Sequence, residues 1–310
     1  MDRYRDTKLS PEVLAEIRKL HFHTRQLASE GIAGQYRSAF RGRGMEFEEV
    51  REYTPGDDVR SIDWKVSARM NQPYIKMFRE ERELTVMIAV DVSGSTLTGT
   101  RNFLRDELIA RVGAVLTLIA LMNNDKVGLV TFDSKLRTYH PPRKARGAVW
   151  RILHEVMGSL EAQRVKSSSA GTNLADMCDF LSKVLKRRSI VFILSDFMDS
   201  SIKRTLGTLS KRHDVTAIIA GDPADLELPD AGLIKITDPE TDVTSILDTS
   251  DPFIRRKYNE KAMQAKSELR TLLARHRVGR IELQTNQPFM PMLARYFGQR
   301  SSRRTTPGGK

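Results

Sequence analysis

Residues 84–96 read LTVMIAVDVSGST, an apolar run that ends abruptly in an aspartate and is followed by two serines. The five residues before the aspartate are all apolar, so the run lacks the alternation of a strand with one face in water. Such a strand is buried on both faces, which is typical of a parallel sheet covered by helices. In these sheets, ligands bind beyond the carboxyl ends of the strands, where the strand order reverses. Asp91, Ser93 and Ser95 therefore mark a candidate site.

After residue 84, strand patterns alternate with helix patterns along the chain. Further apolar strands are predicted at residues 126–133, 189–196, 214–221 and 280–285. Helical spacing of apolar residues predicts helices at residues 101–123, 145–160, 173–187, 200–212 and 251–277. Residues 126–142 and 232–250 each indicate a hairpin, because turn residues separate two short strand patterns. We therefore predict an α/β fold with a doubly wound, mostly parallel sheet.

The same patterns divide the chain into four regions. Residues 1–33 are expected to hold an N-terminal helix. Residues 34–83 are expected to form a small β-rich module of short strands and turns, because glycines, aromatic residues and turn signals recur there at short intervals. Residues 84–285 form the predicted main domain, and residues 286–310 a short C-terminal helix with a basic tail.

The net charge of +12 is unevenly distributed. Residues 251–310 hold 14 basic and 4 acidic side chains, a net charge of +10, whereas the rest of the chain is close to neutral. A basic segment of this kind is usually a solvated face, and it offers only non-specific attraction to nucleic acid or to an anionic membrane surface. Such binding is an alternative interpretation of the C-terminal segment, with nucleic acid the less favoured of its two ligands.

The composition also bears on the compartment. The apolar runs fall short of the roughly 18 residues that a membrane-spanning helix needs. The first residues, MDRYRDTKLSPEVL, contain no apolar core of a secretion signal. The single cysteine, Cys178, excludes an internal disulfide and a cysteine metal cluster. We therefore expect a cytoplasmic protein.

Oxygen-bearing side chains are expected to gather at the carboxyl edge of the predicted sheet. Asp196 ends one predicted strand, and Thr172 precedes a predicted helix. Together with Asp91, Ser93 and Ser95 they offer two carboxylates and three hydroxyls, which are the donors that a hard cation such as Mg²⁺ prefers. Because hydroxyl ligands are neutral, the ion stays electrophilic, and a carboxylate from outside would complete its shell. The sequence predicts a Mg²⁺ or Mn²⁺ site formed by these five residues.

Other chemistries fit this stretch less well. The serines alone would also suit a capped turn between a strand and a helix. A phosphate loop requires G-x-x-x-x-G-K-[ST], which is absent. A metal-dependent phosphate-ester hydrolase stays an alternative, in which Asp91, Asp133 and Asp196 would hold the ion and Ser93 would be the nucleophile. Because no general base is evident for Ser93, we favour a binding site without catalysis.

These residues resemble a known site. D-x-S-x-S at residues 91–95, combined with Thr172 and Asp196, resembles the metal-ion-dependent adhesion site of the von Willebrand factor A domain. The stretch GRGMEFEEVREYTPGDDVRSIDWK, residues 42–65, resembles the signature of the bacterial domain-of-unknown-function family 58. The resemblance covers about residues 34–250.

The resemblance implies a von Willebrand factor A-like fold with a small N-terminal addition. It implies Ser93, Ser95 and Thr172 as direct ligands of Mg²⁺ or Mn²⁺, with Asp91 and Asp196 acting through water. It further implies a non-enzymatic adaptor that captures a partner carboxylate and works with a MoxR-type AAA+ ATPase or its client. A small-molecule substrate is not expected.

Overall fold

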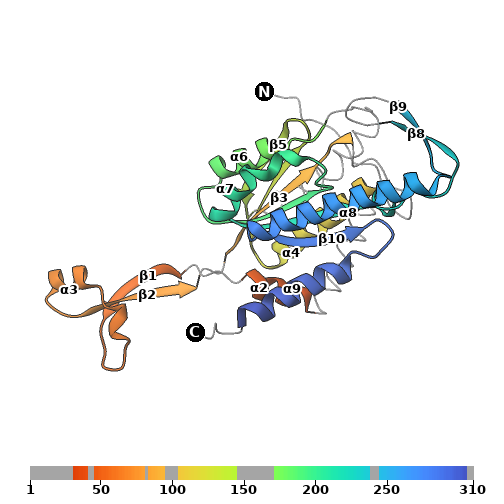
Figure 1. Cartoon of the computed structure of the whole chain (residues 1–310). Helices are drawn as coiled ribbons and strands as arrows, with labels where there is room; N and C mark the ends of the chain where they lie inside the picture. The colour runs from red at the N-terminus through yellow and green to blue at the C-terminus, as the bar shows by residue number, and fades with distance from the viewer. Residues whose placement is uncertain are drawn as a thin grey trace, which may run out of the picture. The chain divides into compact units, whose positions relative to one another are not determined.

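A six-stranded sheet organises the larger part of the chain (Figure 1). The computed structural model describes residues 31–40, 45–80, 83–94, 104–144, 171–237 and 244–305. Contacts divide the chain into two compact units: Phe40–Leu84, and the remainder of the chain on either side of it. Ser95, the helix expected before residue 31 and the helix expected at residues 145–160 lie outside the described residues.

The sheet of the larger unit has five parallel strands and one antiparallel edge strand. Its spatial order is β10 (Gly279–Gln284), β7 (Asp214–Gly221), β6 (Ile190–Ser195), β3 (Thr85–Asp91), β4 (Lys126–Phe132) and β5 (Leu136–Arg143). β5 pairs antiparallel with β4, as the predicted hairpin requires. Read from the β5 edge and numbered along the chain, the order is 3-2-1-4-5-6, so it reverses between β3 and β6. The prediction of a doubly wound, mostly parallel sheet is confirmed.

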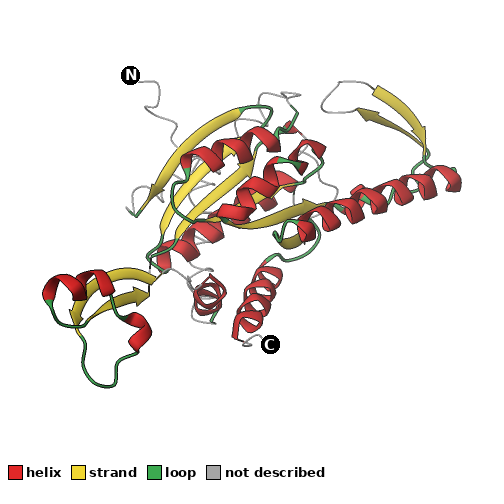
Figure 2. Cartoon of the chain, turned by 60° about the vertical axis from the view of Figure 1, so that its left-hand side comes forward, coloured by secondary structure: helices red, strands yellow, loops and turns green. Residues whose placement is uncertain are grey.

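Helices cover both faces of this sheet (Figure 2). α6 (Leu174–Val184) and α7 (Thr205–Arg212) pack on one face, where their apolar residues join Met87 and Ala89 of β3 in one core cluster. α4 (Arg105–Met122) packs on the opposite face against β3, β4, β6 and β7. Because successive residues of a strand point to opposite faces, both faces of β3 are buried. This double burial explains why β3 carries no polar alternation.

The C-terminal part of the chain adds two long helices and a hairpin. β8 (Leu233–Thr237) and β9 (Thr244–Asp248) pair antiparallel as a separate two-stranded sheet, which confirms the predicted hairpin. α8 (Pro252–Arg275) runs alongside β10 (Figure 1) and begins at Asp251, whose carboxylate accepts a hydrogen bond from the Phe253 N–H at 2.8 Å. α9 (Met290–Thr305) is longer than the predicted helix at residues 289–299.

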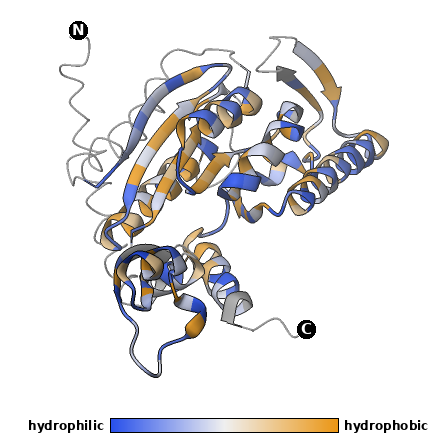
Figure 3. Ribbon diagram, turned by 90° about the vertical axis from the view of Figure 1, so that its left-hand side faces the viewer, coloured by the Kyte–Doolittle hydropathy of each residue, from blue (hydrophilic) through white to orange (hydrophobic). Residues whose placement is uncertain are grey.

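Hydropathy separates the core from the C-terminal elements (Figure 3). Apolar residues are concentrated in the central strands, whereas α8 is mostly hydrophilic and buries Leu273 against the core. α2 (Ile32–Phe40) packs on α9 through the rings of Tyr36 and Phe297, whose centroids lie 5.5 Å apart at an edge-to-face angle. Among the helices that the structure describes, none is long and apolar enough to cross a membrane.

The smaller unit, Phe40–Leu84, contains more helix than we expected. β1 (Met45–Glu52) and β2 (Tyr74–Glu80) form an antiparallel pair, and between them lie a 3-10 turn, η1 (Val59–Ser61), and α3 (Trp64–Met70). The expectation of strands and turns alone was wrong for α3, and also for residues 34–40, which belong to α2. α3 forms because the Asp63 carboxylate caps its first turn, accepting hydrogen bonds from the backbone N–H groups of Lys65 and Val66.

Candidate metal centre

The carboxyl edge of the sheet brings the ends of β3 and β6 together. The two strands are parallel neighbours, with Val90 of β3 opposite Leu194 of β6. Asp91 is the last residue of β3, and Ser195 is the last residue of β6. This edge of these two strands is the point at which the strand order reverses, where ligands bind in doubly wound folds.

Asp91 is fully buried and is held by hydrogen bonds from both strand ends. Its Oδ1 accepts a hydrogen bond from the Ser93 backbone N–H at 2.9 Å. Its Oδ2 accepts one from the Ser195 hydroxyl at 2.6 Å. The Ser195 Oγ in turn accepts a hydrogen bond from the Phe197 N–H at 3.0 Å. Asp91 and the buried Ser93 are therefore fixed in position before any ligand arrives.

Asp196 forms a buried ion pair that we did not anticipate. The Arg105 guanidinium donates from Nη1 to Asp196 Oδ2 at 3.3 Å and from Nη2 to Asp225 Oδ1 at 2.5 Å. The side chains of Arg105 and Asp196 are 2% and 1% exposed, and that of Asp225 is 25% exposed. Arg105 is the first residue of α4, and its two ion pairs thus link the start of this helix to the loops that follow β6 and β7.

The electrostatic environment of Asp91 favours a cation. Burial raises the pKa of the Asp91 carboxyl to about 7, and the neighbouring Asp196 carboxylate raises that pKa as well, against the lowering effect of hydrogen bonds from Ser195 and Ser93. Among the described residues, no basic side chain forms an ion pair with Asp91. A buried carboxylate with only neutral donors is costly to ionise, and a bound cation would remove that cost.

Thr172 lies at the same edge of the sheet. It precedes Asn173, whose backbone N–H donates to the carbonyl oxygen of Asp133 at the end of β4, at 2.9 Å. The next N–H, that of Leu174, donates to Asp199 in the loop after β6, also at 2.9 Å. The start of α6 is therefore tied to the loops that follow β4 and β6, on either side of β3, and Thr172 is half-buried between them. Ser95, the fifth predicted ligand, lies outside the described residues.

Asp133, the third carboxylate of the hydrolase alternative, stabilises the turn between β4 and β5. Its Oδ1 accepts a hydrogen bond from the Lys135 N–H at 2.9 Å, within the tight turn between β4 and β5. Its Oδ2 is paired with Arg137 Nε at 2.5 Å. Asp133 is therefore neutralised by Arg137 and holds the hairpin turn.

The donor set fits a hard divalent ion. Among the residues that the structure describes, no three histidine, cysteine, aspartate or glutamate side chains gather into a metal cluster, so an ion at this edge would depend on hydroxyl ligands. Ser93, Thr172, Asp91 and Asp196 supply oxygen atoms alone, which is the ligand chemistry of Mg²⁺.

Two residues that hold the candidate ligands in place are not among the five predicted ligands. Ser195 precedes Asp196 at the end of a predicted strand, which places it at this edge, but its hydrogen bond to Asp91 is visible only in the fold. Arg105 offered a clearer signal, because a basic residue in the first turn of a helix is opposed by the helix dipole and needs acidic partners. Its partners, 91 and 120 residues further along the chain, are visible only in the fold.

Part of the C-terminal basic charge is used inside the fold. Glu282 of β10 pairs with Lys266 at 3.1 Å, Arg270 at 2.9 Å and Arg280 at 3.1 Å. Arg300 of α9 pairs with Asp214 of β7. These contacts weaken the interpretation of residues 251–310 as a free basic surface for nucleic acid or membrane.

Together, the sheet order and its reversal point define a doubly wound α/β protein with an oxygen-rich site at the carboxyl edge. The chain matches the family described as protein of unknown function DUF58 over residues 49–268, and it belongs to that family. An uncharacterized protein of Mycobacterium tuberculosis is 27% identical over 291 residues, which cover 94% of this chain and 90% of the relative.

Two solved structures are similar to the chain at low sequence identity. BatB from Bacteroides thetaiotaomicron is 15% identical with a TM-score of 0.42, and the match covers 71% of this chain and 99% of BatB. The SpRpn10 VWA domain is 11% identical with a TM-score of 0.32, and the match covers 70% of this chain and 95% of that domain.

Proposed function

We propose that this chain is a non-enzymatic, metal-ion-dependent protein-binding module. Asp91, Ser93, Ser95, Thr172 and Asp196 would hold Mg²⁺ or Mn²⁺ at the carboxyl edge of the sheet, with the three hydroxyls as direct ligands. The observation that carries the proposal is Asp91, a fully buried carboxylate that neutral donors hold at the strand-order reversal. A divalent ion would supply the missing positive charge.

The partner would supply a carboxylate. The neutral hydroxyls leave most of the charge of the ion uncompensated, and Asp196 already shares its charge with Arg105. An aspartate or glutamate from another protein would complete the coordination shell. The resemblance to the family suggests a MoxR-type AAA+ ATPase, or a client of that ATPase, as the source of this residue.

The arrangement favours binding over hydrolysis. A hydrolase would need Asp133 as a third carboxylate, but both oxygens of this carboxylate already bind other groups, Arg137 and the backbone of the β4–β5 turn. Metal-dependent turnover of a phosphate ester that is lost in Asp91→Ala would contradict this proposal.

A pull-down in Mg²⁺ and in chelator tests partner capture. We expect partners that are retained in Mg²⁺, released by the chelator and lost in Ser93→Ala. Ser182→Ala is the matched control, because Ser182 is a buried serine of α6 whose hydroxyl bonds to the Cys178 carbonyl oxygen at 2.8 Å. Partners that stay bound in chelator, and in Ser93→Ala, would show that no ion takes part.

A further inference from the structure

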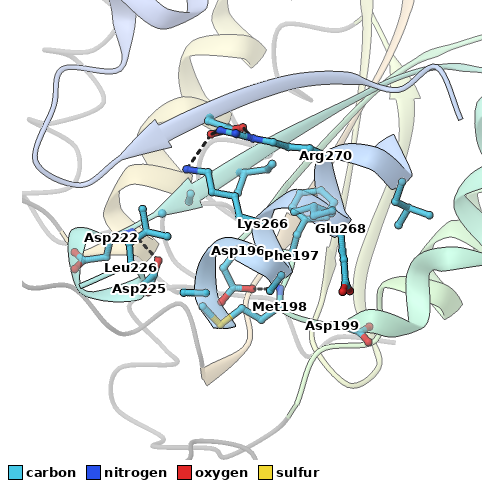
Figure 4. Close-up of a pocket in the computed structure, with 18 of the residues that line it drawn as sticks. Asp196, Phe197, Met198, Asp199, Asp222, Asp225, Leu226, Lys266, Glu268 and Arg270 are labelled. Carbon is cyan, nitrogen blue, oxygen red and sulfur yellow. Dashed lines mark hydrogen bonds and ion pairs between the residues drawn. The ribbon is translucent and has the colours of Figure 1, made fainter. Parts of the chain in front are cut away.

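A pocket of about 400 Å³ opens beside the candidate metal centre (Figure 4). It lies between α8 and the carboxyl ends of β6, β7 and β10, which is the same edge of the sheet that carries Asp91 and Asp196. Cavities of roughly 300–1,000 Å³ accommodate ligands up to the size of a drug molecule. This pocket therefore has room for one or two large side chains of a partner.

The lining of the pocket is largely apolar. Its apolar lining includes Phe197, Ile202, Ile219, Leu226, Leu269 and Leu272. On the α8 side, Ala262 and Ala265 also line it, and Ala265 is exposed at its mouth. An apolar side chain entering the pocket would leave water, which stabilises the complex in proportion to the area buried.

The pocket and the candidate metal centre share a wall. Asp196 lines the pocket, and so does Asp225, and both are bonded to Arg105. Asp196 Oδ1 also accepts a hydrogen bond from the Met198 N–H at 3.1 Å, and Figure 4 shows the two residues next to one another. A segment that places a carboxylate on an ion beside Asp196 would therefore have this pocket within reach of its next side chains.

The backbone between the two features is turned sharply. Phe197 has a φ of +56°, a left-handed conformation that is strained for a bulky residue. The turn places Phe197 in the core and leaves Met198 61% exposed beside the pocket. Exposed methionines are adaptable contacts for apolar partners.

The charges around the mouth also bear on the occupant. Lys266 and Arg270 are paired with Glu282, and Asp199 is held by the N–H groups of Leu174 and Ser201. Lys203, which is exposed on the rim, has no ion pair among the described residues. The lining also holds Asp222, Asp225 and Glu268, so the positive charge that attracts an acidic segment would come from the ion and not from the pocket.

We infer that this pocket binds an apolar side chain of the same protein segment whose carboxylate is captured by the metal ion. The recognised segment has an aspartate or glutamate within a few residues of a leucine, phenylalanine or methionine. This inference rests on the proposed function. It adds the source of specificity, because a single carboxylate on an ion does not distinguish one acidic protein from another.

Selection of a random peptide library on the immobilised full chain, in Mg²⁺ and in chelator, tests this inference. We expect Mg²⁺-dependent enrichment of peptides that combine an acidic residue with a nearby large apolar residue. In a synthetic copy of a selected peptide, exchange of the apolar residue for alanine should weaken binding about tenfold or more.

Two variants of α8 identify the pocket as the binding place. Ala265→Trp fills the mouth, so it should weaken the selected peptide about tenfold or more and remove its preference for the apolar residue. Ser267→Trp, at an exposed position of the same helix that does not line the pocket, should bind as the wild type does. Retained Mn²⁺ binding and an unchanged circular dichroism spectrum would show that both variants are folded.

The outcomes separate the two proposals. Mg²⁺-dependent selection of acidic peptides without an apolar preference, or equal binding by Ala265→Trp and wild type, overturns the pocket inference and leaves the metal-dependent function standing. Selection that does not depend on Mg²⁺, or no selection of acidic peptides, overturns the proposed function and the pocket inference with it.

Discussion

Replacing Arg105 with methionine should destabilise the protein strongly when no divalent ion is present. Methionine keeps much of the side-chain length but removes the charge that Asp196 and Asp225 share. Breaking a buried ion pair typically costs about 3–5 kcal/mol, because the remaining charge stays buried without compensation. The Asp196 side chain is 1% exposed and cannot regain water, whereas that of Asp225, at 25%, can do so in part. We therefore expect a loss of about 3–5 kcal/mol, mainly from Asp196.

Urea unfolding in chelator, followed by far-ultraviolet circular dichroism, measures this loss. Lys266→Met is the matched control, because Glu282 keeps Arg270 and Arg280 when Lys266 is removed, so its loss should stay within about 1 kcal/mol. Adding Asp196→Asn to Arg105→Met should recover much of the stability, since it removes the uncompensated charge. The reasoning is refuted by a loss below about 1 kcal/mol in Arg105→Met, or by strictly additive effects in the double variant.

Three further predictions concern the packing and the charges of the larger unit. In Gly128→Ala the new Cβ would lie 2.8 Å from the His140 carbonyl oxygen, so urea unfolding should show a free energy of unfolding lower by about 1–3 kcal/mol. In the control Gly34→Ala, in α2, the new Cβ meets nothing within 4 Å, so the free energy of unfolding should be unchanged or higher by up to about 1 kcal/mol. Burial alone would raise the pKa of Glu282, but hydrogen bonds from Arg270 and Lys266 outweigh this effect and lower the pKa from 4.5 to about 2. The ionised carboxylate therefore stabilises the fold above pH 4.5, and this stabilisation is lost as the pH falls toward 2. Glu282→Gln should flatten that part of the stability–pH curve, and an unchanged curve would count against the pairing. Burial raises the thiol pKa of Cys178 to about 12, so a thiol reagent should label it only after unfolding, and rapid labelling of the native chain would contradict its place in the core.

The sheet was predictable because strands that are buried on both faces consist of apolar residues without polar alternation, which can be recognised in the sequence. The five apolar residues before Asp91 and the apolar strand at β6 lack polar alternation, and helix patterns separate them. A helix between two successive strands provides the crossover connection that parallel pairing requires, and helices on both faces give the doubly wound arrangement. The smaller unit was harder to predict, because α3 depends on a single cap, Asp63, within a segment rich in turn signals.

The candidate site was predictable only in part, for a physical reason. Asp91 and Asp196 follow apolar strands, so their place at the carboxyl edge follows from the fold class. Their partners do not, because the Ser195–Asp91 hydrogen bond and the Arg105 ion pairs join residues about 100 positions apart in the chain. The register of the parallel strands and the orientation of α4 determine these contacts, and neither can be predicted from a single sequence.

Electron paramagnetic resonance of Mn²⁺ titrated into the full chain tests the central claim, a divalent-ion site at the end of β3, most directly. Free Mn²⁺ gives a sharp signal that disappears on binding, so the titration counts sites. We predict one Mn²⁺ per chain that excess Mg²⁺ displaces, with affinity at least tenfold weaker in Ser93→Ala and unchanged in Ser182→Ala. Equal binding by wild type and Ser93→Ala, or no loss of the free Mn²⁺ signal with the wild type, would contradict the account.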